Sequence, residues 1–569
     1  MPADRARGRR PLSVALRCVT VGLLGVLAGV GLPSAPAAAL APVTTTGTVR
    51  VVPDDGVLVE VDGTRYPGTI ELGGDGEVVN EVELERYLEG VAEMPSRWPG
   101  AALEAQAVAA RTYAWWSARN ASHVGYDLCA TTACQVYRGA EVVLDGGQRW
   151  ADAVAATAGQ VLLDDDGAPI LARYFSTSGG RTFANEDVFP ATGPRPYLVA
   201  IDDPFDEVSP YHRWEVRFDR EDFDALLAEG QRLVDVVPVA EVERTGAVDD
   251  LASRLRFTGR DGTVVEVTPL EVRDFLNRLA PARFPSRYPS QRSDRLRPLP
   301  TTVPSTRFTI EVTDEEVVLD GRGWGHGVGL GQYGAQGRAA AGQDHETILA
   351  AYYGGLTPTT TADLPDTVRV GLGRREQVRL VVHGAARLET SEGEVVQERV
   401  VGRWAAAFRD GSWQLAPPAV AGDDGVIGPT REVSTLLGVR DAVTVEADVA
   451  VDALLSLEVT GPDGELVLTR DLGLAGPGTH AATWRLEDDR GAPVAAGTYR
   501  LALVGEDAAG LRDGTSVEVE VDTPGTDGRS DGMLPLAASG TLSPLLVLAV
   551  SVLALAGIFL IVRTSRSRP

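Results

Sequence analysis

The sequence predicts an α+β fold, in which a mixed helix and sheet domain at 42–362 is followed by small β units. Three observations lead to this prediction. Short alternating runs bounded by Gly and Asp fill residues 46–79 and return after residue 366. Patterns with the period of a helix lie between them, at 80–120. No repeat of fixed length indicates a solenoid, and a chain of 569 residues holds roughly two to four domains.

The two ends of the chain predict where it lies in the cell. Residues 1–40 begin with arginines, continue with an apolar run and end in small residues, as a cleavable secretion signal does. An uncleaved signal anchor is the alternative. Residues 543–562 are uncharged, apolar and long enough to span a bilayer, and the tail at 563–569 is basic. Arginines beside a span stay in the cytoplasm, so we expect a single-pass protein of the cell membrane, anchored by a C-terminal transmembrane helix, with its bulk extracytoplasmic.

The net charge of −27 argues against two kinds of binding partner, nucleic acids and anionic lipid surfaces. Strong negative charge repels the phosphates of nucleic acid, so we expect no nucleic-acid partner. For the same reason the body of the chain should not adhere to an anionic lipid surface. The overall composition is that of a globular protein, and only the stretch at 523–541, rich in Gly, Ser, Asp and Pro, is predicted to be a flexible stalk.

The mixed domain is predicted to begin with strands and to continue with a helix. Runs such as 48-TVRVV-52 alternate apolar and polar residues, as half-buried strands do. At 80–94 the apolar residues instead recur three and four positions apart, which predicts a helix with one buried face. Asn80 and Glu83 have the spacing of a capping box, so we expect the helix to begin there.

Glu93 lies at the expected end of this first helix. Pro95 stops the helix near Glu93, because the residue before a proline avoids helical angles. Pro99 suits the first turn of a second helix, which runs to about Asn120. The negative end of the helix dipole and burial between the two helices would both raise the pKa of Glu93. A carboxyl that keeps its proton near neutral pH can act as a general acid, whereas most glutamates at helix ends are ordinary exposed residues.

The loop 123-HVGYDLCATTACQVYRG-139 contains the two cysteines that lie outside the predicted signal. A short disulfide between Cys129 and Cys134 is the expected state outside the cell. Zinc is the alternative, with His123 and both cysteines as ligands. A fourth protein ligand is missing, because Ala133 occupies the position beside Cys134. The residues favour the disulfide and leave zinc open.

Two further segments have the composition of binding loops. The segment 321-GRGWGHGVGLGQYGAQG-337 contains a formal GxGxxG match, but no βαβ unit surrounds it, so no nucleotide site is predicted. Its glycines predict backbone that passes close to a ligand or another strand, and it presents His326, Gln332 and Tyr333. The segment 174-YFSTSGGRTFANEDVF-189 is dense in small hydroxyls and glycine, which predicts a polar turn or a groove that binds sugar hydroxyls.

Four runs of the chain, in this order, resemble the signature of the stage II sporulation protein D family (SpoIID/LytB, also called amidase enhancer). They are 80-NEVELERYLEGVAEMPSRWPGAALEAQAVAARTYA-114, 125-GYDLCATTACQVYRG-139, 174-YFSTSGGRT-182 and 321-GRGWGHGVGLGQYGAQGRAAAG-342. The resemblance covers about residues 46–357. It implies that the mixed domain is a catalytic domain with a glycan-binding groove, and that the chain is a lytic transglycosylase (a peptidoglycan lyase) in cell-wall remodelling.

The resemblance also implies roles for particular residues. Glu93, in the EMP motif of the family, would protonate the oxygen that links N-acetylmuramic acid to N-acetylglucosamine. Its conjugate base would then help the C6 hydroxyl of the sugar close a 1,6-anhydro ring, so that one carboxyl suffices where other glycosidases need two. The expected substrate-binding residues are Gln106, Arg111, Tyr113, Ser176, Ser178, Gly179, His326, Gln332 and Tyr333.

The resemblance does not decide whether the chain binds zinc, but it does imply which partners the chain has. A zinc-binding variant of the family uses a His…Cys…His-Cys pattern, which maps onto His123, Cys129, position 133 and Cys134, and alanine at position 133 removes one ligand. Members without metal also work, so no cofactor is required. The expected partner is the glycan strand of peptidoglycan. The alternative function is a non-catalytic glycan-binding enhancer of a cell-wall amidase, and a weaker one is a structural adhesin built on the β units.

The C-terminal half is predicted to be β throughout. A small β unit is expected at 366–418, and a larger one at 435–522. The run 484-WRLEDDRGAPVAAGTYRLALVGEDAAG-510 is similar to the immunoglobulin-like domain of the flagellar hook-cap protein family. This similarity implies an Ig-like β-sandwich that serves as a spacer or a binding module.

Overall fold

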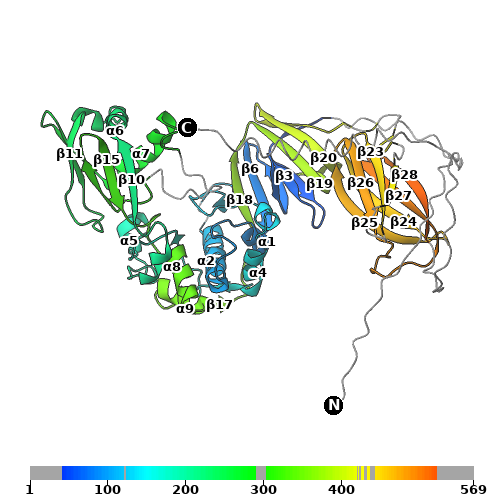
Figure 1. The fold of residues 1–569 in the computed structure, drawn as a ribbon, viewed down its shortest axis with the longest axis horizontal. Coiled ribbons are helices and arrows are strands. Elements are labelled where there is room, and N and C mark those ends of the chain that lie inside the picture. Colours follow the sequence, from blue (N-terminus) through cyan, green and yellow to red (C-terminus); the bar gives the residue numbers. More distant parts are fainter. Residues whose placement is uncertain are drawn as a thin grey trace, which may run out of the picture. The chain divides into compact units, whose positions relative to one another are not determined.

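A computed structural model describes residues 42–521 of the chain, except 121–122, 290–302, 420, 422–424, 429–431 and 436–441 (Figure 1). The predicted signal (1–40), stalk (523–541), membrane span (543–562) and basic tail (563–569) lie outside the described residues. None of the helices within the described ranges is long and apolar enough to cross a membrane.

The largest sheet has eleven strands, built from the N-terminal part of the predicted mixed domain, from Leu128–Cys129 and from the segment that follows the domain. Its strands run in the order β1-β21-β20-β19-β2-β5-β6-β18-β7, with β3 paired to β19 and β4. The bounds are β1 Val43–Thr46, β2 Val49–Pro53, β3 Val59–Val61, β4 Thr64–Tyr66, β5 Thr69–Leu72, β6 Glu77–Glu83, β7 Leu128–Cys129, β18 Thr367–Arg374, β19 Gln377–Thr390, β20 Val395–Arg409 and β21 Ser412–Ala416.

The prediction of a separate β unit at 366–418 is therefore wrong. β18 pairs antiparallel with β6, and Figure 1 shows the two strands side by side although almost 300 residues separate them in the chain. Leu380, Trp404 and Trp413 from the later strands are buried in the same hydrophobic core as Val49 and Ile70. The alternation in 366–418 predicts strands correctly, but strand alternation does not say which edge of which sheet a strand joins.

The first predicted helix, at 80–94, is shorter than expected and begins later, because its first four residues belong to a strand. β6 extends to Glu83, and the helix α1 covers only Leu84–Glu89. Strand pairing overrides the helical period because β6 has a partner on each side, β5 and β18. The predicted cap at Asn80 is also wrong, since Asn80 lies within β6 and its amide donates to the carbonyl oxygens of Pro67 and Thr69 at 2.8 and 3.2 Å.

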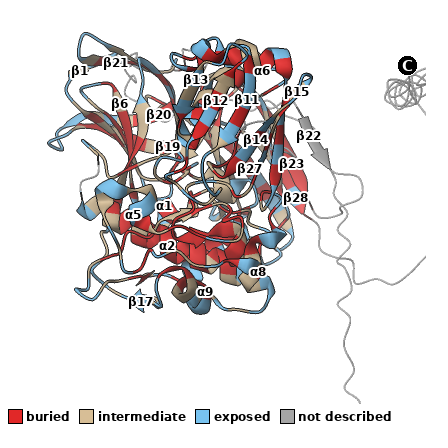
Figure 2. Cartoon of the chain, turned by 90° about the vertical axis from the view of Figure 1, so that its left-hand side faces the viewer, coloured by how far each residue is buried: buried red, intermediate tan, exposed pale blue. Residues whose placement is uncertain are grey.

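The second predicted helix is confirmed. α2 covers Gly100–Arg119, with Pro99 before it and Asn120 after it. Its small apolar residues Leu103, Ala107 and Ala110 are completely buried, and Figure 2 shows the helix as one of the most buried elements. The helices α4 Gln148–Ala156, α8 Gln332–Ala340 and α9 His345–Tyr352 contact α2, as does the strand β8 Gln160–Val161. The remaining short elements are α3 Glu141–Leu144, α5 Asn185–Val188, η1 Pro190–Thr192 and η2 Pro204–Val208, with β8 paired to β17 Thr359–Thr360 and β9 Tyr174–Phe175 paired to β16 Leu330–Gly331.

Residues 214–321 form an insertion with a hydrophobic core of its own, which the sequence reading did not separate from the rest of the domain. Phe218, Phe223 and Phe257 are fully or almost fully buried there. One sheet contains β10 Trp214–Asp219, β15 Glu316–Gly321 and β14 Phe308–Val312, and a second contains β11 Val239–Arg244, β12 Leu255–Gly259 and β13 Val264–Val267; the helices are α6 Arg220–Leu227, η3 Leu233–Val236 and α7 Pro269–Arg283. The insertion therefore interrupts the chain between the two predicted binding loops.

The C-terminal part contains two sheets, as the β pattern at 435–522 predicts. A three-stranded sheet has the order β22-β23-β26, and a four-stranded sheet has the order β25-β24-β27-β28. The bounds are β22 Glu432–Thr435, β23 Val443–Val449, β24 Ala453–Thr460, β25 Leu466–Ala475, β26 Gly478–Trp484, β27 Gly497–Asp507 and β28 Arg512–Val521. Trp484 is completely buried and lies 5.1 Å from the ring of Tyr499. Membership of the Ig-like family stays a prediction.

Candidate active site

Glu93 lies in an extended segment just after α1, and a second segment holds its carboxylate from behind. The backbone of 90–92 pairs with that of 136–138, through Ala92 N–H to Val136 O at 2.8 Å and Arg138 N–H to Gly90 O at 2.8 Å. The Val136 amide then donates to Glu93 Oε1 at 2.7 Å. Glu93 is half-buried, and its other oxygen, Oε2, accepts from Gln332 Nε2 at 3.4 Å. Both oxygens of the carboxylate therefore have a hydrogen-bond donor, and the one from Gln332 is long.

The prediction that Glu93 ends a helix is wrong, and the cause of its raised pKa is different from the one expected. α1 ends at Glu89, and Gly90 follows it because a Cβ at this position would lie 2.4 Å from the ring of Tyr137. Desolvation by the surrounding protein raises the pKa of Glu93, while hydrogen bonds from Val136, Gln332 and Tyr174 act in the opposite direction. Within the described ranges no cation forms an ion pair with this carboxylate. Burial, without a helix dipole, therefore favours the protonated acid.

A group of buried tyrosines lies around Glu93. Tyr87 of α1 donates to Gln135 Oε1 at 2.7 Å, and Gln135 Nε2 donates to the carbonyl oxygen of Ala110 on α2 at 3.3 Å. Burial raises the pKa of Tyr87 and of Tyr174 well above the usual value, and Glu93 contributes to both shifts. These phenols are therefore neutral hydrogen-bond donors at physiological pH. The sequence alone does not single out Tyr87, Gln135 and Tyr174 as site residues, although all three lie in the motifs that resemble the SpoIID family.

The glycine-rich segment passes close to another strand, as predicted. β16 pairs in parallel with β9, with Leu330 opposite Tyr174 and Gly331 opposite Phe175. Gly329 has φ +79°, and a Cβ there would lie 2.1 Å from the carbonyl oxygen of Arg173. Only glycine permits so close an approach. This packing places the beginning of α8 beside Glu93.

Gln332 and Tyr333 are the predicted residues that this segment brings to Glu93. Gln332 is 7% exposed, and its Nε2 donates to Glu93 Oε2 at 3.4 Å. Tyr333 donates its backbone N–H to Ser176 O at 3.0 Å, and its ring meets the edge of Trp98 at 4.8 Å. Ser176 belongs to the second predicted binding loop. Two predicted loops and the EMP segment thus converge on one carboxyl group.

His326 serves the structure of the site. Its Nδ1 accepts the backbone N–H of Val328 at 3.1 Å, and its ring lies 5.5 Å from Phe175 and 5.3 Å from Phe189. Burial, and secondly the charge of Arg173, lower the pKa of His326 to about 4. The imidazole is therefore neutral at physiological pH. Its hydrogen bond and ring contacts are with Val328, Phe175 and Phe189 rather than with Glu93.

The three polar residues predicted on α2 have different surroundings. Arg111 is completely buried and donates to both carboxylate oxygens of Glu85 at 2.7 Å, as well as to the carbonyl oxygens of Val154 and Gln160. Its guanidinium therefore holds the fold together. Gln106 is completely buried, and neither of its amide atoms has a hydrogen-bond partner among the described residues. Tyr113 is half-buried, and burial raises its pKa while Arg173 lowers it.

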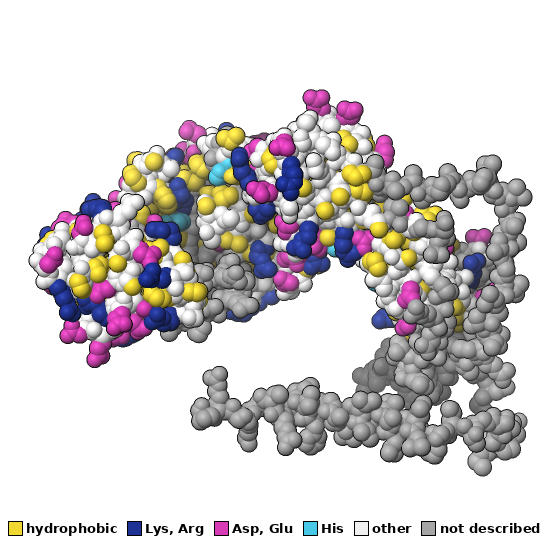
Figure 3. Space-filling view, turned by 90° about the horizontal axis from the view of Figure 1, so that it is seen from above, with side chains coloured by type: hydrophobic (Ala, Val, Ile, Leu, Met, Phe, Trp, Pro, Cys, Tyr) yellow, Lys and Arg dark blue, Asp and Glu magenta, His cyan; other side chains and the backbone are white. Residues whose placement is uncertain are grey.

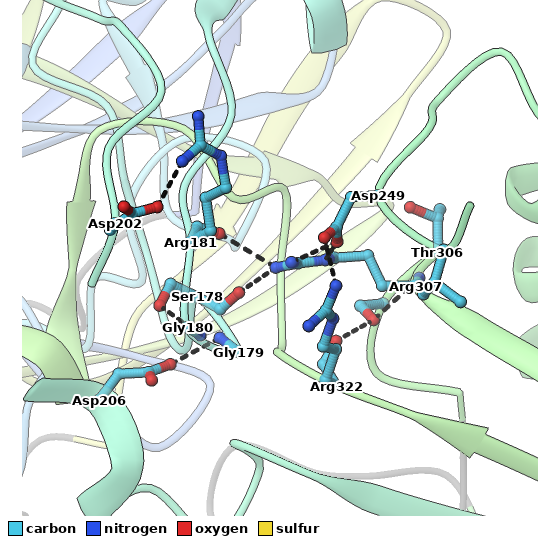
Figure 4. Close-up of polar contacts among 12 residues, drawn as sticks. Ser178, Gly179, Gly180, Arg181, Asp202, Asp206, Asp249, Thr306, Arg307 and Arg322 are labelled. Carbon is cyan, nitrogen blue, oxygen red and sulfur yellow. Dashed lines mark hydrogen bonds and ion pairs between the residues drawn. The ribbon is translucent and has the colours of Figure 1, made fainter. Parts of the chain in front are cut away.

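The loop that contains Ser176, Ser178 and Gly179 is held by η2 and by the insertion (Figure 4). The Gly179 N–H donates to Asp206 Oδ2 at 2.6 Å, and Gly179 has φ +65°. Arg307, 3% exposed, donates to the carbonyl oxygens of Ser178 and Arg181. These contacts fix the backbone of the loop. The Ser176 hydroxyl lies 3.3 Å from that of Thr177, and it is half-buried.

The cysteine loop closes with a Cys129–Cys134 disulfide. His123 Nε2 lies 3.2 Å from Cys134 Sγ, and the three potential ligand atoms are all within 4.8 Å of one another. These residues do not fit zinc in this form of the chain, because two bonded sulfurs offer no thiolate and Ala133 supplies no fourth ligand. That the chain needs no cofactor stays a prediction.

On the face drawn in Figure 3, acidic and basic side chains of the described residues are interspersed, although the net charge of the chain is −27. Such a surface gives a neutral polysaccharide no electrostatic barrier, whereas it offers nucleic acid no basic patch on that face.

Comparison with known proteins identifies the family. The family model described as "Stage II sporulation protein" matches residues 73–163, which contain Glu93 and the cysteine loop. An uncharacterized protein of Brachyspira hyodysenteriae is 32% identical over 291 residues, 49% of this chain and 67% of the relative. Stage II sporulation protein D of Bacillus subtilis is 28% identical over 299 residues, 50% of this chain and 76% of the relative. The chain therefore belongs to the stage II sporulation protein D family.

Two other similarities cover a smaller share of the protein that is compared. The amidase enhancer of Bacillus subtilis is 30% identical over 341 residues, 53% of this chain, which span only 45% of the enhancer. A solved structure of PorZ, a bacterial surface component of the type-IX secretion system of Porphyromonas gingivalis, matches at 12% identity over 26% of this chain and 21% of its own. Its TM-score of 0.13 is too low to support any inference about the fold. Members of the family are thus named for sporulation and for amidase enhancement.

Proposed function

We propose that the chain is a lytic transglycosylase that cleaves the bond between N-acetylmuramic acid and N-acetylglucosamine in peptidoglycan. The observation that carries this proposal is the setting of Glu93, a half-buried carboxyl whose pKa desolvation raises. The groups that act on its pKa are Val136, Gln332 and Tyr174, and no second carboxylate is among them. Hydrolysis of a glycosidic bond ordinarily uses a pair of carboxyls. A single acid that also serves as the base fits cleavage without water.

The reaction follows from this geometry in two proton transfers. The protonated Glu93 gives its proton to the bridging oxygen, the bond from that oxygen to C1 of the muramyl sugar breaks, and an oxocarbenium-like state forms. The Glu93 carboxylate then accepts the proton of the C6 hydroxyl, and O6 bonds to C1 to close the 1,6-anhydro ring. Val136 and Gln332, which donate to the carboxylate, stabilise it between the two transfers.

The second loop and α8 supply the binding surface in this proposal. Ser176 carries a half-buried hydroxyl next to Tyr333, whose ring is also half-buried. Hydroxyls and aromatic rings suit the hydroxyl groups and the apolar faces of a sugar. Arg111 and His326 support the fold around the site. We place the activity outside the cell, because the predicted secretion signal precedes the domain in the sequence and the predicted membrane span follows it.

The test is Glu93→Gln in the full chain, acting on purified sacculi. We expect the release of 1,6-anhydro-muropeptides to fall by at least about a hundredfold, since general acid catalysis contributes about 10²–10⁴. Liquid chromatography with mass spectrometry measures products that are lighter by one water than those of hydrolysis. Glu83→Gln is the matched control, because Glu83 is exposed at the beginning of α1 and caps nothing. Unchanged release by the Glu93 variant would refute the assignment.

The second candidate is a non-catalytic enhancer of a cell-wall amidase. The relative named amidase enhancer favours it, although the matched region spans under half of that protein. The same Glu93→Gln variant separates the candidates. An enhancer would increase the release of stem peptides by an added amidase equally well with either residue at position 93, and neither chain would produce anhydro ends alone.

A further inference from the structure

The segment at 134–138 forms the back wall of the candidate site. Val136 donates to Glu93, and Gln135, completely buried, accepts from Tyr87. Tyr137, 3% exposed, donates to Asn80 Oδ1 at 2.7 Å. Each of these contacts depends on where the backbone of the segment lies. A shift of about 1 Å would lengthen the Val136 hydrogen bond beyond its useful range.

One end of the back wall is bonded covalently to the large sheet. Cys134 begins the segment and is joined to Cys129, with one residue, Gln135, between Cys134 and Val136. Cys129 ends β7, which pairs in parallel with β18 through Leu128 opposite Val370 and Cys129 opposite Gly371. The disulfide therefore connects the edge of the sheet to the residue pair that holds Glu93.

The part of the cysteine loop nearest the disulfide is the least protected. Thr131, Thr132 and Ala133 between the two cysteines are exposed, whereas Ala130 N–H donates to Gly371 O of β18 at 3.1 Å and Tyr137 N–H donates to Ala130 O at 3.2 Å. The backbone N–H of Cys134 donates to Thr131 O at 3.0 Å, within the exposed stretch. Exposed hydrogen bonds open easily, so the disulfide contributes most at Cys134, where the back wall begins.

We propose that the Cys129–Cys134 disulfide positions Glu93 for catalysis, by fixing the Val136 amide that holds the carboxylate. This inference rests on the proposed function and names the device that keeps the site in its active geometry. In the zinc-binding family variant a metal would tie the corresponding residues together. Here Ala133 and the bonded sulfurs do not fit zinc, and a covalent bond closes the same loop. Both cysteines are positioning residues, since neither contacts Glu93.

The experiment uses the full chain with Cys18→Ala, so that only this pair of cysteines can respond. Dithiothreitol reduces the disulfide to two thiols and is itself oxidised to its cyclic disulfide. Two measurements are made on the oxidised and the reduced chain at a temperature where circular dichroism shows both to be folded. One is hydrogen exchange of peptides covering 130–138, and the other is kcat and KM for the release of anhydro-muropeptides.

We expect reduction to accelerate exchange at Val136 and to lower kcat by about tenfold or more, because a hydrogen bond to a charged group is lost. KM should change by less than about threefold, since the binding loop at 176–182 is held elsewhere. Reoxidation with oxidised glutathione should restore the rate. The double variant Cys129→Ser with Cys134→Ser should have the low rate of the reduced chain and be insensitive to dithiothreitol.

Three results would overturn the proposal. The first is a reduced, folded chain with the same exchange at 130–138 and the same kcat. The second is a purified chain that contains one zinc ion and two free thiols. The third is a reduced chain whose exchange is faster but whose kcat is unchanged. Failure of the proposed function gives a different result, because the oxidised chain would then produce no anhydro ends, while hydrogen exchange would still report whether the disulfide holds the back wall.

Discussion

At the scale of the residue, the chemistry depends on how Glu93 is solvated. It faces Tyr87 from α1, Tyr174 from β9, Gln332 from α8 and the Val136 amide from the cysteine loop. None of these groups is charged at neutral pH. No cation therefore compensates for the desolvation of the carboxylate, and the ionised form of Glu93 lowers the stability of the folded chain. Such a cost at one residue is typical of catalytic positions.

This cost predicts how stability depends on pH. The pKa of Glu93 is raised in the folded chain, so its contribution to stability is fully present below the usual glutamate pKa and is lost as pH rises through the folded-state pKa. Glu93→Gln cannot ionise. We expect the variant to unfold at a higher temperature than the natural chain at pH 7 and at a similar temperature at pH 4, as measured by thermal unfolding. A lower unfolding temperature at pH 7 would show that the carboxylate is stabilised, contrary to this account.

At the scale of the element, the insertion at 214–321 supports the binding loop. Arg307 lies in the insertion, directly before β14. Its guanidinium contacts Ser178 O, Arg181 O and the carboxylate of Asp249 (Figure 4). It also lies 5.0 Å over the ring of Phe183. Asp249 is shared with Arg322, which follows β15. A side chain of the insertion thus sets the backbone position of a loop that lies more than a hundred residues earlier.

Replacing Arg307 tests this link. Arg307→Ala leaves two carbonyl oxygens without this donor and Asp249 with Arg322 as its remaining partner, so we expect a loss of about 2 kcal/mol in stability, less than for a fully buried pair because Asp249 is partly exposed. The released loop should raise KM for sacculi more than it lowers kcat, as steady-state kinetics would measure. Arg260→Ala, whose ion pair with Asp314 on the insertion is exposed, is the control and should change neither parameter. Equal effects of the two variants would argue against a role for the insertion.

At the scale of the whole molecule, the predicted architecture is a domain that acts on the wall while it remains attached to the membrane. The described part of the chain contains the SpoIID domain with its insertion and a C-terminal part of two sheets. The predicted stalk and span follow that part in sequence. The predicted attachment would limit the part of the wall that the site reaches, and it would have no role in the proposed chemistry at Glu93.

Truncation tests this separation of roles. A chain that ends at residue 541 lacks the predicted span and should appear in the soluble extracytoplasmic fraction, while the full chain stays with the membrane. Its release of anhydro-muropeptides per molecule from purified sacculi should equal that of the full chain. Fractionation with immunodetection, followed by the sacculus assay, measures both. Membrane retention of the truncated chain would contradict the predicted C-terminal anchor.

Local patterns of the sequence determined much of what is observed. The alternation in 46–79 and after residue 366 gives strands, and Pro99 with the alanine-rich run gives α2. The motifs that resemble the SpoIID family include Glu93, Gln332 and the cysteine loop, and the structure brings these three together. They are found from sequence because each depends on neighbours within a few residues: a proline, a periodic apolar face or a dense run of glycine.

Only the tertiary structure decided the rest. Residues 80–83 follow a helical period, yet they form a strand because β5 and β18 pair on both sides of β6, and β18 comes from a distant part of the chain. The pKa of Glu93 is raised by burial, which depends on Tyr174, Gln332 and the back wall at 134–138, and not on the end of a helix. Arg111 resembles a ligand-binding residue in sequence, but in the fold its Nε and Nη2 donate to the carboxylate of Glu85. Contacts between residues far apart in the chain set these outcomes, and periodicity carries no information about them.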